Sequence, residues 1–204
     1  MFQFAIYREA MERMNNFRWE AQLGISTRGI VEIDKPDSCH YASINYSTIH
    51  KVLGRLDLQS SDTFVDIGSG KGRVLCCASR HKCRKVIGIE YSLPFCDEAR
   101  MNIQKMRGRK APVEVHHGLA EEFDYTHVTA LYLFTPFGPM TLDAMLHKVQ
   151  GDTHPHPVRM AFVNPSAAQE VVFAKHVWLE RYDGWNPKPG EAHAVSFYRR
   201  KMGG

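Results

Sequence analysis

The sequence is poor in the features that mark several large classes of protein. Its 204 residues contain five cysteines, an odd number without a C-x-x-C pair, which excludes a disulfide framework and the usual zinc spacings. No apolar run approaches the roughly 18–20 residues that a membrane-spanning helix needs. The first residues also lack the basic start and apolar core of a secretion signal. We therefore expect a cytoplasmic protein with no membrane partner.

Composition and charge exclude further classes. With 44% hydrophobic and 24% charged residues, the chain is close to an average soluble domain, which argues against collagen, coiled coil and disorder. The formal net charge of +4 is too small to name a partner, although basic residues cluster at 80–85, 105–110 and 199–201. The length predicts an N-terminal helical accessory segment, residues 1–38, followed by one domain, residues 39–204.

A metal cluster has weak support in the sequence. His81 lies between Cys77 and Cys83, which are residue types that bind zinc. All three residues fall within one helix and its exit turn, where packed thiols are the more common arrangement. We therefore expect no metal.

Five β-rich runs alternate with helical patterns from residue 63 onward. The runs cover residues 64–67, 86–90, 113–115, 130–134 and 160–163. Several are apolar throughout, which is typical of parallel strands buried on both faces. The clearest helix covers residues 92–106, with Ser92 as N-cap and Pro94 in the first turn. This succession predicts a doubly wound α/β sheet.

The two ends of the chain follow other patterns. Residues 177–182 and 194–198 read as two strands with no helix between them, which predicts an antiparallel hairpin with its tip at residues 185–189. Residues 40–56 are expected to form a helix. An earlier helix has one face marked by Phe4, Tyr7, Met11 and Met14.

A glycine loop follows the first strand of the alternating region. Asp66-Ile67-Gly68-Ser69-Gly70-Lys71-Gly72 leaves the strand and enters a helix, and glycine allows backbone to approach a ligand closely there. The NAD fingerprint requires glycine at position 73, which is arginine, and the P-loop requires Ser or Thr after Lys71. Both nucleotide motifs therefore fail. What remains is a G-x-G-x-G loop with one acidic residue, Asp66, closing the first strand and another, Glu90, closing the second.

This set of features resembles the class I S-adenosylmethionine-dependent methyltransferases. Over nearly the whole chain, residues 23–31, 40–46, 64–75 and 134–138 are similar to a group of small bacterial methyltransferase-like proteins of unassigned substrate. A more distant similarity is to the non-SET protein lysine methyltransferases. The resemblance implies a Rossmann-like, seven-stranded α/β sheet with a C-terminal antiparallel β-hairpin, and S-adenosyl-L-methionine as cofactor.

The resemblance also implies which residues bind the cofactor. The loop gives room for the methionine part, Asp66 orients it, and Glu90 accepts hydrogen bonds from both ribose hydroxyls. Tyr91 or Leu119 would flank the adenine. The remaining loop residues in this set are Gly68, Ser69, Gly70 and Gly72.

Two points qualify this cofactor site. Asp66 and Glu90 could instead merely cap adjacent helices, although carboxylates at both strand ends are costly to desolvate without a polar partner. Many relatives carry Gly-Asp-Ala where this chain has Gly118-Leu119-Ala120. Adenine-amino recognition must then come from Glu121, Glu122 or backbone.

The end of the fourth strand is expected to face the methyl acceptor, because ligands of open α/β sheets bind at the carboxyl ends of the strands. Amino-methylating relatives often carry [DN]-P-P-[FY] or N-P-F there, where this chain has Thr135-Pro136-Phe137. A threonine hydroxyl still accepts one hydrogen bond, so Thr135 and Phe137 are expected to touch a nitrogen acceptor. The alternative is a plain strand exit with a buried Phe. Asn164 should line the same mouth, as a helix cap or a second polar contact.

No general base is evident from the sequence. Methyl transfer is an in-line displacement that depends mainly on orientation, and it needs a base only if the nucleophile arrives protonated. Candidates by residue type are Tyr41, Tyr46, His116, His117 and His193.

The sequence thus predicts an S-adenosylmethionine-dependent methyltransferase that acts on nitrogen. Because the basic clusters connect helices to strands, we expect them at the edge opposite the site, mainly as solvated charge. Nucleic acid bound there could not reach the methyl. A protein or small-molecule acceptor is therefore favoured over nucleic acid. The alternatives are a non-catalytic scaffold that binds the same cofactor and a nicotinamide-dependent oxidoreductase, which Arg73 disfavours.

Overall fold

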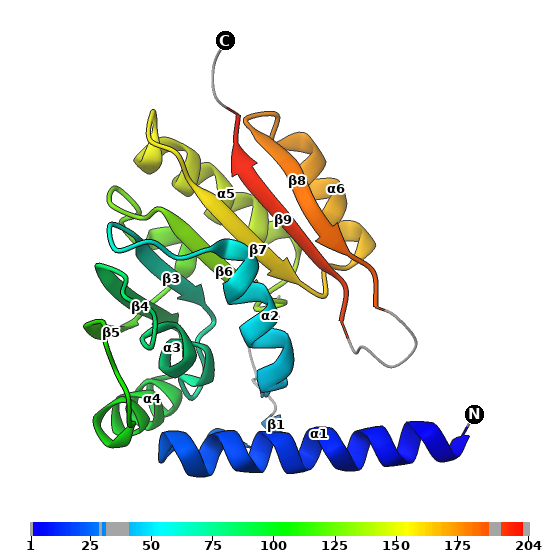
Figure 1. Cartoon of the computed structure of the whole chain (residues 1–204). Helices are drawn as coiled ribbons and strands as arrows, with labels where there is room; N and C mark the ends of the chain where they lie inside the picture. Colours follow the sequence, from blue (N-terminus) through cyan, green and yellow to red (C-terminus); the bar gives the residue numbers. More distant parts are fainter. Residues whose placement is uncertain (1, 29, 32–40, 188–192, 202–204) are drawn as a thin grey trace.

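A seven-stranded sheet forms the centre of the molecule (Figure 1). The computed structural model describes residues 2–28, 30–31, 41–187 and 193–201. The strands of this sheet are β3 (Thr63–Ile67), β4 (Lys85–Glu90), β5 (Val113–His117), β6 (Ala130–Phe134), β7 (Arg159–Val163), β8 (Leu179–Trp185) and β9 (Val195–Arg200). Their order is β5-β4-β3-β6-β7-β9-β8, with β9 antiparallel to both neighbours and β3 to β7 parallel. The predicted doubly wound sheet with a C-terminal hairpin is confirmed.

Helices cover both faces of this sheet. One face carries α2 (Tyr46–Leu56), α3 (Arg73–Ala78) and α4 (Leu93–Lys105), and the other carries α5 (Pro139–Thr153), α6 (Ala167–Lys175) and the short 3₁₀ turn η1 (Ala120–Glu122). Successive side chains of β3 alternate between the two cores: Phe64 joins the first, and Val65 and Ile67 join the second. The apolar runs of the inner strands are therefore buried on both sides, as predicted. Only the edge strand β5 is largely exposed among the parallel strands.

The N-terminal helix α1 (Phe2–Leu23) lies across one end of the molecule, and its first turns extend beyond the sheet (Figure 1). Its buried side includes Glu20 and Leu23. The apolar face noted in the sequence points to solvent instead, because Tyr7, Met11 and Met14 are exposed, and Phe17 of the same helix is exposed as well. The side chain of Phe4 lies outside the described residues.

The expected helix over residues 40–56 begins later than predicted. Tyr41–Ala42 form a short strand, β2, which pairs with β1 (Ile30–Val31), and α2 starts at Tyr46 after an extended Asn45. The cause is distant in sequence: Asn16 of α1 accepts a hydrogen bond from the Tyr46 backbone N–H at 3.1 Å and donates one to the Asn45 side chain at 2.7 Å. Residue 40 lies outside the described part.

The C-terminal hairpin is longer than the sequence pattern indicated. Trp185, expected at the tip, is the last residue of β8 and pairs with Val195. Its ring packs on Phe197 at 5.5 Å between centroids. The end of the expected tip, residues 188–189, and the segment boundary near residue 38 lie outside the described residues. Within the described part of the chain, none of the helices is both long and apolar enough to span a membrane.

Candidate functional site

The glycine loop connects β3 to α3 at the carboxyl edge of the sheet. Gly68, Gly70 and Gly72 have φ values of 72°, 50° and 82°, a region that glycine enters without steric cost. The backbone N–H groups of Gly68 and Ser69 both donate to the carbonyl oxygen of Ile89, at 2.9 and 3.0 Å. The loop is therefore fastened to the end of β4.

Two of these glycines are required by contacts within the chain. A Cβ at Gly68 would lie 2.7 Å from the Cβ of Pro136, and one at Gly72 would lie 3.1 Å from the Cβ of Ala99. Close approach of protein therefore accounts for glycine at positions 68 and 72. The sequence had suggested that these glycines make room for a ligand, and their role in ligand binding stays a prediction.

Asp66 and Glu90 are both buried, but their hydrogen bonding differs. Glu90 accepts hydrogen bonds from the backbone N–H groups of Gly70 and Ser92, each at 2.8 Å and each to a different carboxylate oxygen. Ser92 is the N-cap of α4, so Glu90 does satisfy a helix start, as the capping alternative had it. Each oxygen keeps a further lone pair for a ligand. No residue in the described part of the chain donates a hydrogen bond to Asp66.

The electrostatics of these buried carboxylates favour a ligand that is positively charged and carries hydroxyls. Burial raises the pKa of Asp66 well above its ordinary value, and the charge of Glu90 adds to this effect. Burial also raises the pKa of Glu90, although its backbone hydrogen bonds offset part of the increase. The buried hydroxyls of Ser69 and Tyr132 have no hydrogen-bond partner among the described residues. Unpaired buried groups of this kind are costly until a ligand satisfies them.

The strands β6 and β7 end in strained backbone. Thr135 and Asn164 have φ values of 39° and 57°, which are unusual for residues with a side chain, above all for a β-branched one. The Thr135 hydroxyl lies 3.2 Å from the carbonyl oxygen of Val163 and 3.0 Å from that of Asn164, to which it donates. The N-cap of α6 is Ser166, so the cap role considered for Asn164 is wrong. Asn164 stays a candidate polar contact.

Phe137 is half-buried and packs against the core beneath α5 and α6. Its carbonyl oxygen accepts a hydrogen bond from Gln169 Nε2 at 2.7 Å. This packing agrees in part with a plain strand exit. A direct role of the ring toward an acceptor stays a prediction.

The residues expected near adenine follow the next two strands. Tyr91 comes directly after β4 and is half-exposed, and its carbonyl oxygen lies 2.9 Å from His117 Nε2. Leu119 is half-buried and precedes η1. Both therefore lie at the carboxyl edge, on the β5 side of the glycine loop.

The candidate bases occupy unlike environments. His116 and His117 are exposed on the edge strand, and Tyr46 is buried with the Arg73 guanidinium 4.7 Å from its ring centroid. His193 lies edge-on to Phe134, the last residue of β6, with 5.0 Å between ring centroids. Its Nδ1 is buried without a hydrogen-bond partner in the described part of the chain. The side chain of the fifth candidate, Tyr41, lies outside the described residues.

Sequence reasoning missed the role of Arg73, which it used only to exclude the NAD fingerprint. The buried Arg73 guanidinium lies 3.0 Å from the Glu20 carboxylate and donates to the Thr27 hydroxyl and the Ile44 carbonyl oxygen, each at 2.7 Å. Burial alone would raise the pKa of Glu20, but bonds from Thr27 and Arg28 and the charge of Arg73 outweigh it and lower that pKa. The one signal in the sequence was an arginine at the position where the NAD fingerprint requires glycine.

A second bridge joins the N-terminal segment to the loop. Asn102 of α4 donates hydrogen bonds to the carbonyl oxygens of Lys71 and Ser26, at 2.9 and 3.0 Å, and accepts one from the Ser26 N–H at 3.1 Å. Residues 26–28 therefore lie beside the glycine loop. No local pattern around Asn102 indicates this contact.

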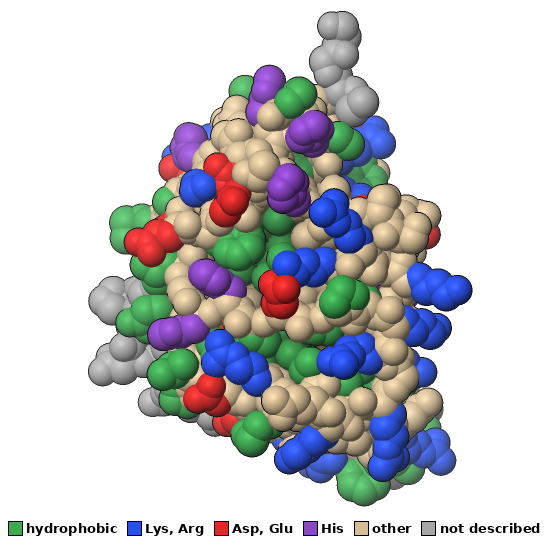
Figure 2. Space-filling view, turned by 90° about the vertical axis from the view of Figure 1, so that its left-hand side faces the viewer, with side chains coloured by type: hydrophobic (Ala, Val, Ile, Leu, Met, Phe, Trp, Pro, Cys, Tyr) green, Lys and Arg blue, Asp and Glu red, His purple; other side chains and the backbone are tan. Residues whose placement is uncertain are grey.

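The basic clusters lie at the opposite edge, as predicted. Lys85 and Val113 begin two parallel strands, and Arg199 pairs with Arg159 at the start of a third. Seen from the β5 side, Lys and Arg side chains gather on the right of the surface, with few acidic ones among them (Figure 2). Arg200 differs from the prediction of solvated charge, because it is buried and donates to the Gln150 carbonyl oxygen and the Thr153 hydroxyl.

Comparison with known proteins finds one similar family and many similar folds. Residues 35–120 match the model of a family described as Histone methylation protein DOT1. No curated protein sequence matches the chain.

Solved structures similar to this one include two methyltransferases and a fibrillarin. An RNA methyltransferase from Salinibacter ruber, in complex with S-adenosyl-L-homocysteine, has a TM-score of 0.63 and 19% identity over 78% of this chain and 94% of its own. A SAM-dependent O-methyltransferase from Thermotoga maritima has a TM-score of 0.57 and 19% identity over 78% of this chain and 67% of its own. Fibrillarin from Aeropyrum pernix, with natively bound S-adenosyl-L-methionine, has a TM-score of 0.53 and 16% identity over 74% of this chain and 73% of its own. This chain therefore has the fold of the class I methyltransferases.

Proposed function

We propose that the protein is an S-adenosylmethionine-dependent methyltransferase that transfers a methyl to a nitrogen acceptor. The observation that carries the proposal is the pair of buried carboxylates, Asp66 and Glu90, beside a left-handed glycine loop with unpaired hydroxyls. Similar structures support the choice of cofactor, since they include complexes with S-adenosylhomocysteine and S-adenosylmethionine.

The residues fit this cofactor group by group. Glu90 has a free lone pair on each oxygen for the two ribose hydroxyls, and Asp66 offers a carboxylate to the cationic methionine part. Ser69 and Tyr132 supply hydroxyls that lack hydrogen-bond partners in the described part of the chain. Tyr91 and Leu119 would flank the adenine. When bound, the cofactor would supply a methyl on a sulfonium, and its transfer to a nucleophile would release S-adenosylhomocysteine.

On the acceptor side, the chain's own contribution is orientation. The Thr135 hydroxyl donates to the end of β7 and still has lone pairs to accept an N–H from the acceptor. Phe137 supplies an aromatic wall from the same turn. Because Pro136 sits against Gly68, this turn and the cofactor loop hold each other in place, which is how proximity lowers the barrier of a displacement.

His193 is our candidate for accepting the acceptor's proton. Burial lowers the pKa of His193, which keeps its imidazole neutral near pH 7. Its Nδ1, which has no hydrogen-bond partner among the described residues, lies beside the end of β6. His193→Gln should then slow transfer while leaving S-adenosylhomocysteine affinity unchanged. Equal transfer rates at every pH would exclude this role.

A protein side chain is the acceptor that we favour, followed by a small molecule. The match to a histone methylation family supports this order. The basic clusters lie at the opposite edge and do not line the site, which argues against nucleic acid. Cytoplasmic location is part of the proposal, since the cysteines in the described residues are free and buried, as in a reducing compartment.

Calorimetric titration with S-adenosylhomocysteine tests the cofactor site. Glu90→Ala should cost about 1–3 kcal/mol of binding free energy, because two ligand hydroxyls lose their acceptor. Gly70→Val should cost more, since valine cannot hold this left-handed backbone. Glu180→Ala, at an exposed ion pair on β8, is the matched control and should bind normally. Wild-type affinity in both site variants would contradict the proposal, and tight NADH binding instead would indicate an oxidoreductase.

Incubation with methyl-labelled cofactor and a cell extract tests the reaction. Label in a protein band would support a protein acceptor, and label in the small-molecule or nucleic-acid fraction would name another class. Cofactor binding without transfer to any fraction would favour a non-catalytic scaffold.

A further inference from the structure

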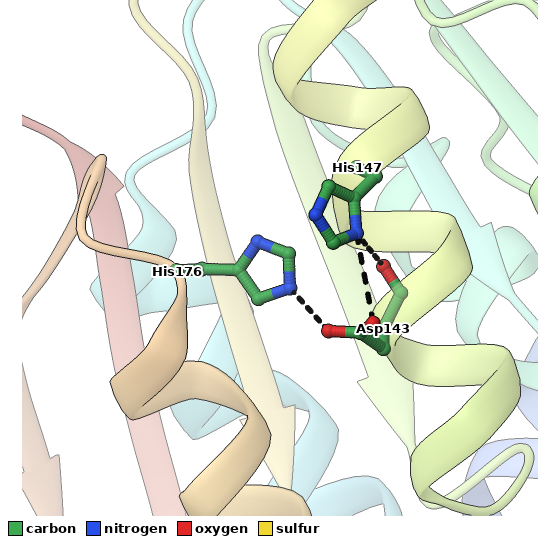
Figure 3. Close-up of side chains that lie close together, drawn as sticks. All are labelled: Asp143, His147 and His176. Carbon is green, nitrogen blue, oxygen red and sulfur yellow. Dashed lines mark hydrogen bonds and ion pairs between the residues drawn. The ribbon is translucent and has the colours of Figure 1, made fainter.

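Three potential metal ligands converge between α5 and the end of α6 (Figure 3). Asp143 and His147 lie one turn apart on α5, and His176 is the C-cap of α6. His176 Nε2 lies 2.9 Å from Asp143 Oδ1, and His147 Nδ1 lies 3.7 Å from Asp143 Oδ2. None of the three belongs to the cofactor or acceptor site described above.

We propose that Asp143, His147 and His176 bind a divalent transition-metal ion of the zinc type. Their donor atoms all lie within 4.8 Å of one another. Ligands of a tetrahedral zinc ion, with bonds of roughly 2.0–2.1 Å, lie about 3.3 Å apart. The separations of 2.9 and 3.7 Å, which run to the two different oxygens of Asp143, fall on either side of this value. Two imidazoles and one carboxylate suit zinc and its neighbours, whereas magnesium and calcium prefer oxygen ligands alone.

The burial of the cluster leaves a route for an ion. The His176 side chain is only 3% exposed, while those of Asp143 and His147 are 45% and 67% exposed. Side chains four residues apart on a helix share one face, so Asp143 and His147 both face the cluster. His147 Nδ1 lies 2.9 Å from the Asp143 backbone carbonyl oxygen, and this hydrogen bond must break for Nδ1 to bind an ion. An ion can enter from solvent and keep water at an open coordination position. Once bound, it would link α5 to the end of α6.

Trp178 opposes this ion in the present hydrogen-bonding state. Its indole N–H donates to His176 Nδ1 at 3.2 Å, and because an indole is only a donor, the His176 hydrogen must be on Nε2, facing Asp143. Metal binding at Nε2 requires this hydrogen to move to Nδ1, where it would face the indole N–H. The tryptophan should therefore weaken metal binding, and its removal should strengthen it.

Zn²⁺ calorimetry and the visible absorption of added Co²⁺ test the site on full-length protein without an affinity tag. We expect one ion per chain. His147→Ala, at an exposed position that should leave the fold intact, is expected to lower Zn²⁺ affinity by at least about tenfold, as is Asp143→Ala. His156→Ala removes an exposed histidine elsewhere and should change nothing. Trp178→Phe should raise the affinity.

The contrary outcomes are distinct. No binding in either the wild type or Trp178→Phe would overturn the proposal, as would binding that survives His147→Ala. Equal affinity of wild type and Trp178→Phe would overturn His176 Nε2 as a ligand atom. None of these measurements depends on S-adenosylmethionine, so they stand apart from the proposed methyl transfer.

Discussion

Pro136 lies directly against Gly68, close enough that a Cβ on the glycine would be 2.7 Å from the proline Cβ. This contact seats the turn after β6 on the loop after β3. The proposed acceptor side and cofactor side of the site therefore share one contact, made where Gly68 has a left-handed backbone and Thr135 a strained one.

Gly68→Ala should lower both stability and cofactor affinity. The added methyl meets Pro136, and the positive φ is unfavourable for alanine, so we expect a loss of about 1–3 kcal/mol in the free energy of unfolding. Urea denaturation and titration with S-adenosylhomocysteine measure the two effects. Gly54→Ala, in α2 with no atom near the new methyl, is the matched control and should stabilise by roughly 0.5–1 kcal/mol. A Gly68→Ala protein as stable as wild type would mean that the turn yields easily.

Asp66→Asn should make the ligand-free protein more stable at neutral pH. Burial raises the folded-state pKa of Asp66, so stability present below the unfolded-state pKa of about 3.9 is lost as pH rises through the folded-state pKa. Asparagine does not ionise and avoids this loss.

Urea denaturation across a pH series checks the Asp66 prediction. The stability difference between Asp66→Asn and wild type should grow from near pH 4 upward. The affinity of Asp66→Asn for S-adenosylmethionine should be lower than that of wild type. Asp97→Asn, at an exposed carboxylate paired with Arg100, should show no such growth. Parallel curves for Asp66→Asn and wild type would show that Asp66 is already stabilised as an anion.

Phe137→Ala should separate binding from transfer. If the ring orients the acceptor, S-adenosylhomocysteine affinity should stay nearly intact while the transfer rate falls by at least about tenfold, because small misplacement of a nucleophile is costly. Met140→Ala, at an exposed residue just beyond the same turn, serves as control. Since Phe137 also packs on the core, a joint fall in affinity and melting temperature would assign it to packing alone.

Glu20→Gln should destabilise the protein strongly. It leaves the buried Arg73 guanidinium without its carboxylate, a change that costs on the order of 3–5 kcal/mol at buried ion pairs. Cofactor affinity should fall as well, because Arg73 directly follows the loop. Denaturant unfolding should show recovery in the double variant Glu20→Gln/Arg73→Met, and Glu9→Gln, in the exposed pair with Arg13, should have no measurable effect. Equal stability of wild type and Glu20→Gln would mean that the network contributes nothing net.

The sheet could be predicted from the sequence because its signal is local. Each inner strand is a short apolar run between helical patterns, and the structure moves their ends by only a few residues. The start of α2 could not be predicted in this way. Asn16, some thirty residues earlier, caps it, and the residues before it pair with another strand.

The positions of the glycine loop and Glu90 could also be predicted from the sequence, because they form a compact motif at the ends of adjacent strands. The cluster of Asp143, His147 and His176 could not be predicted from the sequence. The spacing of Asp143 and His147 is visible in the sequence, but the approach of His176 depends on how α6 packs on α5. The sequence likewise contains Arg73, but it does not show that the ion-pair partner of Arg73 is Glu20, which lies in the distant helix α1.

The shared burial of Glu20, Thr27 and Arg73 has a consequence for how these positions vary among related sequences. Each of the three satisfies another: Arg73 and Thr27 both donate to Glu20, and Arg73 also donates to the Thr27 hydroxyl. A substitution of one of them alone leaves each of the other two buried with one hydrogen-bond partner fewer. In sequences descended from a common ancestor with this chain, we expect the three positions to covary, so that a lineage with a small residue at position 73 also lacks the carboxylate at position 20.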